Sequence, residues 1–351
     1  MASRSPRATR TKFHRLLPRR RGLRWGLFAS CLLLVTAVCA GGFAYARLSG
    51  GIRTDETADR TLAAEHGSRP VARAPRAQNI LLMGSDIEAT KDSQRSDTTM
   101  LLHLSADRKR AALVSVPRDL MVDIPACRTW EGERSEPEYA QFNWAFERGG
   151  SACAIRTFED LTGVRVDHHL VVDFTGFEEI VDALGGIDVK VPQRMRVPGG
   201  DVVLDKGKQH LDGAQALVFV RGRTGVGDGS DLQRIERQKE FARVMMHHVR
   251  QARLLDRPAE LYDVLDAVTS SLTADRGLDS LPELGRLAKD VGAVPERRVA
   301  VVTVPSVEHP DYWGRYMPVE DQADALFEAL REDRALPAHL YNAYDPDNDE
   351  L

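Results

Sequence analysis

An α/β sandwich with one central mixed sheet, preceded by one transmembrane helix, is the fold class that this 351-residue sequence predicts. Two observations support the prediction. Short apolar runs typical of buried strands are interspersed along the chain with segments of helical periodicity, and such elements pack in layers around one sheet. Ahead of them, residues 25–46 contain no charged side chain. That length matches the ~20 apolar residues that a helix needs to cross a bilayer.

The first 24 residues form a basic tail that contains nine arginines and lysines and no acidic residue. Basic residues in front of an apolar helix keep that end of the chain in the cytoplasm. We therefore expect a single-pass protein of the cell membrane, with its N-terminus cytoplasmic and its main domain extracytoplasmic. The remaining residues carry a net charge of −13, which argues against a nucleic-acid partner.

The fate of the apolar segment has one open alternative. The small residues Ala44 and Ala46 flank Tyr45 in a pattern that a signal peptidase could cleave. The segment is longer than the apolar core of an ordinary signal peptide, about 7–15 residues, and this favours a retained anchor.

The rest of the chain is divided by composition. Residues 47–77 contain Gly50-Gly51, Pro70, Pro75 and scattered charges without a sustained apolar period, so they predict an extracytoplasmic linker. A folded domain is expected over 78–335 and an acidic tail over 336–351. The expected strands are 79–83, 98–105, 111–116, 166–172, 187–191 and 299–304. The expected helices are 138–148, 152–161, 174–184, 213–220, 232–255, 258–272, 278–291 and 321–330.

Two cysteines lie inside the predicted domain, Cys127 and Cys153. Exported proteins meet oxidising conditions, so a disulfide between them is the favoured interpretation, with two free buried thiols as the alternative. The histidine pairs 168–169 and 247–248 do not predict metal sites, because neighbouring side chains diverge on strands and on helices.

Charged residues gather where the first predicted strands begin or end. Asp86 directly follows one strand, Arg95 and Asp97 precede the next, and Arg118 and Asp119 follow the third. Ligand sites in α/β proteins form at strand ends. Two carboxylates can hold one hard cation such as Mg²⁺, so Asp86 and Asp97 are the candidate metal ligands. The alternative for each residue alone is an ordinary charged turn.

Four arginines and a glutamine form a second cluster around the start of a long predicted helix: Arg221, Arg223, Arg234, Arg237 and Gln238. Arg234 and Arg237 share a helix face. Guanidinium groups gathered in this way repel one another unless they meet an anion. Phosphate is the natural anion, because it accepts bidentate bonds from arginine. A helix stabilised by surface salt bridges is the alternative.

The two clusters lie in segments that resemble the LytR-CpsA-Psr family from about residue 79 to 238, and more weakly to about 305. The resembling segments are NILLMGSD (79–86), RSDT (95–98), VPRD (116–119), VDFTGF (172–177), DALGGI (182–187), VRGR (220–223) and DLQRIERQ (231–238). We expect no counterpart of the C-terminal extension domain that some members carry.

The resemblance implies an α–β–α sandwich and a reaction. Members of the family move a glycopolymer from a polyprenyl diphosphate carrier to peptidoglycan or a related wall sugar. They use Mg²⁺, with Mn²⁺ as the alternative ion, at aspartates matching Asp86 and Asp97. Their arginines, matching Arg118, Arg221, Arg223, Arg234 and Arg237, bind the diphosphate together with a glutamine matching Gln238. We add Arg95 to this set.

The resemblance also implies an apolar tunnel for the lipid tail. The expected lining repeats at helical spacing and comprises Phe174, Phe177, Ile180, Val181 and Leu184. The alternative for each of these side chains is ordinary core packing.

A transfer of this kind needs alignment and positive charge rather than covalent chemistry from the protein. The expected catalytic residues are Asp97, Arg118, Asp119 and Arg221, and either Asp97 or Asp119 is the candidate base for the attacking hydroxyl. Two other functions stay open from sequence. One is a non-catalytic regulator that binds lipid diphosphates, and the other is a lipid-diphosphate hydrolase.

Overall fold

The computed structural model describes residues 36, 39, 41–85, 96–196, 203–222 and 231–340. The chain forms two compact units, residues 1–47 and 48–351. The described residues of the first unit are helical. Within the described part of the chain, no helix combines the length and the apolar character needed to span a bilayer. Most of the predicted transmembrane helix, residues 25–46, lies outside the described residues.

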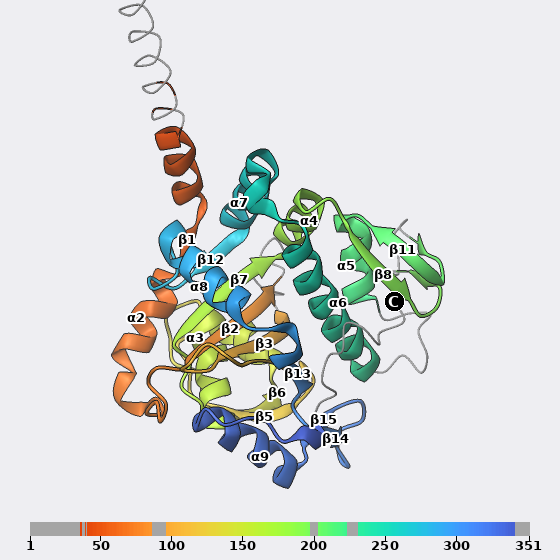
Figure 1. The fold of residues 1–351 in the computed structure, drawn as a ribbon. Helices are drawn as coiled ribbons and strands as arrows, with labels where there is room; N and C mark the ends of the chain where they lie inside the picture. The colour runs from red at the N-terminus through yellow and green to blue at the C-terminus, as the bar shows by residue number, and fades with distance from the viewer. Residues whose placement is uncertain are drawn as a thin grey trace, which may run out of the picture. The chain divides into compact units, whose positions relative to one another are not determined.

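A mixed seven-stranded sheet forms the centre of the second unit, counted over the described residues (Figure 1). Its order is β1 (Arg53–Thr54), β12 (Leu272–Ala274), β7 (His168–Asp173), β2 (Gln78–Ser85), β3 (Ser96–Leu104), β4 (Ala111–Val116) and β13 (Val299–Thr303). Strands β2 and β7 are parallel, as are β4 and β13, whereas β3 is antiparallel to both of its neighbours.

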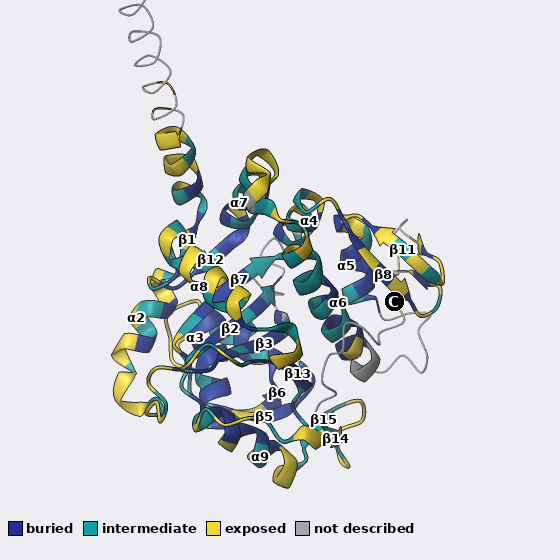
Figure 2. Ribbon diagram, viewed as in Figure 1, coloured by how far each residue is buried: buried dark blue, intermediate teal, exposed yellow. Residues whose placement is uncertain are grey.

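Helices cover both faces of the sheet and bury separate apolar cores (Figure 2). One face packs against α2 (Glu56–Ala64), α3 (Asn143–Thr162) and α9 (Glu320–Arg331). The other packs against α6 (Asp231–Gln251), α7 (Pro258–Ser271) and α8 (Leu281–Ala293). The apolar residues of β2 alternate between these faces, so that Leu81 and Met83 join one core while Ile80 joins the other.

A third apolar core lies beside the second face and belongs to a smaller lobe. It is built from α4 (Phe174–Ala183), α5 (Gly213–Arg221), part of α6, β8 (Ile187–Val191), β9 (Met195–Arg196), β10 (Val203–Leu204) and β11 (Gly207–Leu211). Asp173 caps the start of α4. After Leu184, at the end of the helix, the chain turns through Gly185 and Gly186, which both have positive φ. This is the stop that the two glycines predicted.

The prediction of a linker over residues 47–77 was wrong. This segment forms β1, α2 and the short 3-10 helix η1 (His66–Ser68), and β1 pairs with β12 at the edge of the sheet. Helix α2 buries only Ala58 and Leu62. Two apolar contacts on a nine-residue helix are too few to produce a visible apolar period in the sequence.

The prediction of a helix over residues 138–148 was also wrong in its first part. Residues Glu138–Gln141 form β6, which pairs with β5 (Met121–Ile124), and Ala140 is its buried residue. Helix α3 starts only at Asn143 and continues to Thr162 through non-helical backbone at Gly149 and Gly150. The two helices expected on either side of these glycines are therefore one kinked element.

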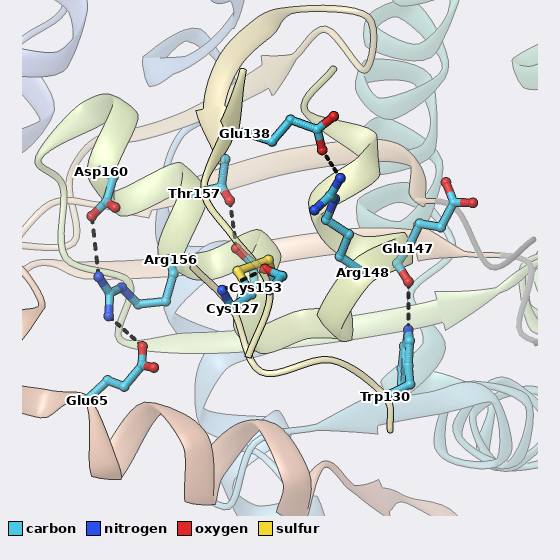
Figure 3. Close-up of a disulfide and its surroundings, with 11 residues drawn as sticks. Glu65, Cys127, Trp130, Glu138, Glu147, Arg148, Cys153, Arg156, Thr157 and Asp160 are labelled. Atoms are coloured by element: carbon cyan, nitrogen blue, oxygen red, sulfur yellow. Dashed lines mark hydrogen bonds and ion pairs between the residues drawn. A yellow bond between two sulfur atoms is a disulfide. The ribbon is translucent and has the colours of Figure 1, made fainter. Parts of the chain in front are cut away.

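The predicted disulfide between Cys127 and Cys153 is present (Figure 3). It connects the loop after β5 to the second half of α3. The absence of a side chain at Gly149 makes this approach possible, because a Cβ there would lie 2.4 Å from the carbonyl oxygen of Arg128. In the same loop the ring of Trp130 lies against Gly150 and its Nε1 donates to the carbonyl of Glu147.

Candidate functional site

Both charged clusters of the sequence are connected to one edge of the central sheet. Strands β2, β4, β7 and β13 end at this edge, and the antiparallel β3 begins there, as the pairs Ser85↔Ser96, Ser85↔Asp173 and Thr99↔Val116 show. Asp86 follows Ser85 in the sequence but lies outside the described residues, as do Arg95 and Arg223. Arg118 follows Val116 at the same edge. We call this edge the site edge.

The backbone of β3 bulges at Asp97. Gly84 pairs with Thr98 and Ser85 with Ser96, so Asp97 is the extra residue of the strand. Ser96 stabilises the bulge, because its Oγ donates to the carbonyls of Gly84, at 3.2 Å, and Thr98, at 2.9 Å. Bulges redirect side chains and are frequent beside active sites. The side chain of Asp97 itself is not among those described.

Helix α4 starts at the site edge and meets the end of α5. Asp173 is the last residue of β7, and its Oδ1 accepts a bond of 2.7 Å from the backbone N–H of Gly176. The next residue, Phe174, presents its ring to Arg221, whose guanidinium carbon lies 3.7 Å from the ring centroid. A guanidinium over an aromatic face is held by a cation–π attraction. Arg221 is thereby fixed near the end of β7.

Helix α6 is bound to both β3 and α5 through its predicted site residues. The Nε2 of the buried Gln238 donates to Thr98 Oγ1 at 3.0 Å and to the carbonyl of Val220 at 3.2 Å. The buried Arg237 donates from Nε to the carbonyl of Phe219 at 3.2 Å and from Nη2 to that of Gly222. Arg234, on the same helix face, is also buried.

These contacts connect β3, α6, α5 and α4 around the site edge. Gln238 of α6 bonds both β3 and the end of α5, and Arg221 at that end contacts Phe174 of α4. Asp173, which precedes Phe174, pairs with Ser85, and Ser85 pairs with β3. The arginine-bearing end of α5 and the start of α6 therefore lie beside the strand ends that bear Asp97. The sequence separates these two groups by more than 100 residues.

The Arg118–Asp119 pair is held on the same edge by a residue from far along the chain. Arg118 Nε lies 3.2 Å from Asp119 Oδ2, and Arg315 Nη1 lies 3.3 Å from Asp119 Oδ1. The amide of Gln141, in the orientation that satisfies both of its ends, adds a bond to Asp119 and accepts from Arg315. The Asp119 carboxylate is thus fixed between two guanidinium groups.

The site edge offers oxygen ligands suited to a hard cation. Within the described residues, the fully buried Oγ of Ser85 has no hydrogen-bond partner, and Asp173 lies opposite it in the neighbouring strand. Asp86 follows Ser85 in the sequence, and Asp97 follows Ser96, the residue that pairs with Ser85. Hydroxyl and carboxylate oxygens are the ligands that Mg²⁺ prefers. Among the described side chains there is no group of three or more His, Cys, Asp or Glu residues that forms a metal site.

The residues predicted to line a lipid tunnel lie on α4. Val181 is fully buried in the core of the smaller lobe. Phe177 is half-buried and contacts Phe241 of α6, with ring centroids 5.4 Å apart. Phe174, Ile180 and Leu184 are half-buried. Val181 therefore makes ordinary core contacts, and a lipid-binding role of this helix stays a prediction.

Four residues of the site were not identified from the sequence. Thr98 and Asp173 lay within the resembling segments, but no spacing indicated their bonds to Gln238 and Gly176. Gln141 lay in a stretch predicted to be helical. Arg315 is 196 residues away from Asp119, and no local signal reveals a contact of that range.

The LytR_cpsA_psr family model matches residues 48–332. Cell wall biosynthesis protein LcpA of Corynebacterium glutamicum is 27% identical over 298 residues, which cover 74% of this chain and 57% of LcpA. Polyisoprenyl-teichoic acid–peptidoglycan teichoic acid transferase TagT of Bacillus subtilis is 31% identical over 231 residues, 61% of this chain and 66% of TagT. The matched part thus spans about half to two thirds of these curated relatives.

Solved structures show the same fold. TagV of Bacillus subtilis aligns with a TM-score of 0.58 at 22% identity, over 74% of this chain and 98% of that one. The LytR-Csp2A-Psr enzyme from Actinomyces oris aligns with a TM-score of 0.58 at 21% identity, over 80% of this chain and 94% of that one. The predicted α/β architecture with a central mixed sheet is confirmed.

Proposed function

The chain belongs to the LytR_cpsA_psr family, and from this premise we propose that it is a phosphotransferase of cell-wall assembly. Its donor is a glycopolymer on a polyprenyl diphosphate carrier, its acceptor is peptidoglycan or a related wall sugar, and it releases polyprenyl phosphate. Relatives that bear the name polyisoprenyl-teichoic acid–peptidoglycan teichoic acid transferase support this donor and acceptor class.

One contact gives the strongest structural support. The bond of Gln238 to Thr98 places the start of α6 against the residue that follows the Asp97 bulge. This contact supports a site to which both the basic start of α6 and the strand that bears Asp97 contribute. Phosphate groups with a bound cation need both kinds of group at once.

In the proposed reaction, the oxygen of a wall hydroxyl forms a bond to the phosphorus that carries the sugar. The bond from this phosphorus to the bridging oxygen breaks, and polyprenyl phosphate leaves. Arg221, oriented by the Phe174 ring, and Arg118, oriented by Asp119, bind phosphate oxygens as the leaving group gains charge. Arg234 and Arg237 are buried and add positive charge from beneath the site, and Arg95 and Arg223 adjoin these residues in the sequence.

A Mg²⁺ ion held by Asp86 and Asp97 would neutralise charge on the diphosphate when bound, and Mn²⁺ is the alternative ion. Ser85 and Asp173 are further oxygen groups at the site edge. Because both oxygens of Asp119 are engaged by Arg118 and Arg315, we assign Asp119 to positioning Arg118, and Asp97 to accepting the proton of the attacking hydroxyl.

The N-terminal segment fits this reaction by its location. We propose that residues 25–46 anchor the protein in the cell membrane, with the basic tail in the cytoplasm and the second unit outside. A polyprenyl carrier is confined to the membrane, so an anchor raises the local concentration of enzyme around its donor. The half-buried apolar residues of α4 are our candidates for contact with the lipid.

The proposal is tested with the full-length protein in detergent, a polyprenyl-diphosphate-linked glycan and wall acceptor. We expect coupled release of polyprenyl phosphate and glycosylation of the acceptor, which chelator stops and added Mg²⁺ restores. Asp97→Ala should abolish the Mg²⁺-dependent transfer. Arg221→Lys should reduce it about tenfold or more, because an ammonium group cannot replace the guanidinium fork. The exposed Arg60→Lys is the matched control.

Two outcomes would overturn the proposal that the protein is a transferase. Equal release of polyprenyl phosphate with and without acceptor would identify a hydrolase. Tight donor binding without any release would identify a receptor for lipid diphosphates. Full activity of Asp97→Ala in buffer free of chelator would remove both roles of Asp97, as metal ligand and as proton acceptor, and leave the transferase proposal itself standing.

A further inference from the structure

Three aromatic side chains that contact one another, and a fourth that adjoins them in the sequence, lie beside the site edge and are not used by the proposed transfer. They are Tyr139 of β6, His309 and Tyr312 of the connection between β14 (Ser306–Glu308) and β15 (Tyr316–Pro318), and the adjacent Trp313. Ring centroids lie 4.7 Å apart for His309 and Tyr312, and 6.3 Å apart for Tyr139 and Tyr312. We call these four residues the aromatic patch.

The aromatic patch is open to solvent. Trp313 is 99% exposed, Tyr312 48% and Tyr139 44%. A tryptophan left in water forgoes the stabilisation that most large aromatic side chains gain from burial. Exposed aromatic residues that cluster in one place typically mark a binding surface.

The patch is attached directly to the Arg118–Asp119 pair. Strand β15 joins the turn that bears this pair, because Leu120 bridges to Tyr316 and the backbone N–H of Tyr316 donates to the carbonyl of Asp119 at 3.1 Å. Arg315, three residues after Tyr312, bonds the Asp119 carboxylate. Gln141 of β6 touches the same carboxylate, and Tyr139 lies two residues away on the same strand face, roughly 7 Å along the strand.

Acidic side chains surround the aromatic rings. Glu308 and Asp311 are exposed neighbours of His309 and Tyr312, and the exposed Asp123 is paired with Tyr139 across the β5–β6 ladder. Anionic lipid headgroups repel such a rim, because like charges within a Debye length repel one another. Sugars suit it, because their hydroxyl groups donate to carboxylates while their polarised C–H faces stack on the negative face of an aromatic ring.

We propose that the aromatic patch binds a sugar ring of the acceptor glycan and presents the neighbouring hydroxyl to the site edge. Trp313 and Tyr312 supply stacking faces, and Asp311 and Glu308 accept hydroxyl hydrogens. This inference rests on the proposed function, since it identifies the part of the surface that receives the acceptor. It assigns to residues 309–313 a role that is separate from donor binding.

The first test measures binding of the full-length protein, in detergent, to purified peptidoglycan sacculi stripped of attached polymer. Trp313→Ala should weaken binding about tenfold, the size of one lost aromatic contact. Trp313→Phe should retain most of it, whereas Trp313→Leu should not, because leucine is apolar but has no aromatic face. Unchanged binding in Trp313→Ala, or equal binding in Trp313→Leu and Trp313→Phe, would overturn the proposal.

Kinetics separate this inference from the proposed function. Trp313→Ala should raise the KM for acceptor and leave donor binding unchanged, whereas Arg221→Ala should lose donor binding and still bind sacculi. If the wild-type protein transfers glycan and Trp313→Ala has the same KM for acceptor, the inference is wrong and the proposed function stands. A protein that binds sacculi through Trp313 but transfers nothing would defeat the proposed function alone.

Hydrogen exchange distinguishes sugar from membrane. With the full-length protein in nanodiscs of phosphatidylglycerol, soluble glycan-strand fragments should slow exchange in residues 306–318. Protection of these residues by the nanodisc, without a further effect of glycan fragments, would show that the aromatic patch contacts the membrane and would overturn the proposal.

Discussion

The edge of the sheet opposite the site contains a network of buried histidine and aspartate side chains. His168 Nδ1 lies 2.9 Å from Asp275 Oδ2, and His169 Nε2 lies 3.3 Å from Asp55 Oδ2. The bond to Asp275 raises the pKa of His168 against the effect of its burial. Burial of Asp275 opposes its charge, but the bonds from His168 and from the backbone outweigh this and lower the pKa of Asp275.

These opposite pKa shifts make the pair a source of pH-dependent stability. The His168 contribution is complete below the unfolded pKa of about 6.5 and is lost as pH rises through the raised folded value. The Asp275 contribution is present above about pH 4 and is lost as pH falls through its lowered folded value. The charged pair therefore stabilises the fold most between these limits.

We expect His168→Asn to flatten the dependence of unfolding free energy on pH. Asparagine keeps a donor near the Nδ1 position but does not titrate, so the variant should lose of order 1 kcal/mol at pH 6 and less at pH 8.5. Urea unfolding at both values measures this. The exposed His210→Asn is the control, because its partner Asp188 is also exposed. A loss that is the same at both values would show that the pair acts only through packing.

At the scale of single elements, the disulfide and the kink of α3 act together. The Cys127–Cys153 bond closes a loop over a sequence separation of 26 residues, and the loop packs on the helix through Trp130 and the pairing of Arg148 with Glu138 (Figure 3). In the unfolded chain such a crosslink removes conformational freedom, worth about 3 kcal/mol for a loop of this size.

Reduction should therefore lower the melting temperature of the full-length protein. The matched control is Cys127→Ser/Cys153→Ser. Its melting temperature should equal that of the reduced wild-type protein, with or without reductant. Calorimetry in the two conditions measures the difference, and intact mass after alkylation reports the bond. Modification of both Cys127 and Cys153 in the native, unreduced protein would show that the bond does not form in solution.

Local patterns could predict some elements and not others. Helix α4 was predictable because its apolar spacing, its Asp173 cap and its two terminal glycines act within one short segment. Strands β1 and β12 have only two and three residues, and each is fixed by pairing with a distant strand. The sequence of β6 predicts a helix, but the segment forms a strand because its pairing with β5 outweighs the propensity of its residues.

The site shows the same division at the scale of the whole molecule. The residue types could be predicted from the sequence, as could the position of Arg118 after a strand and of Arg221 and Gln238 on helices. The contacts that bring these residues together could not, because Gln238 is 140 residues from Thr98 and Arg315 is 196 from Asp119. The aromatic patch also joins two hairpins that are distant in the sequence.

The start of the folded domain was the main error at this scale. Residues 48–77 supply buried apolar side chains at Leu48, Ile52, Ala58 and Leu62. They also supply Arg69, whose Nε and Nη2 bond both oxygens of Glu159 at 2.8 and 2.7 Å. The Glu159 side chain is completely buried beneath α2 and η1.

A chain that begins at residue 78 should therefore be much less stable than one that begins at residue 48. Its sheet would lack β1, its core would lose the apolar contacts of α2, and Glu159 would keep only Arg165, at 3.9 Å, as a basic partner among the described residues. A buried carboxylate deprived of its main partner typically costs about 3–5 kcal/mol.

Arg69→Ala in the full-length chain isolates the contribution of this buried pair. The exposed Arg73→Ala, which removes a surface ion pair with Glu332, is the control and should change stability little. Thermal unfolding followed by circular dichroism measures all four proteins. Equal melting temperatures for the two truncated chains would restore the linker interpretation, whereas a loss confined to the shorter chain and to Arg69→Ala would show that these residues are part of the fold that holds the site edge in place.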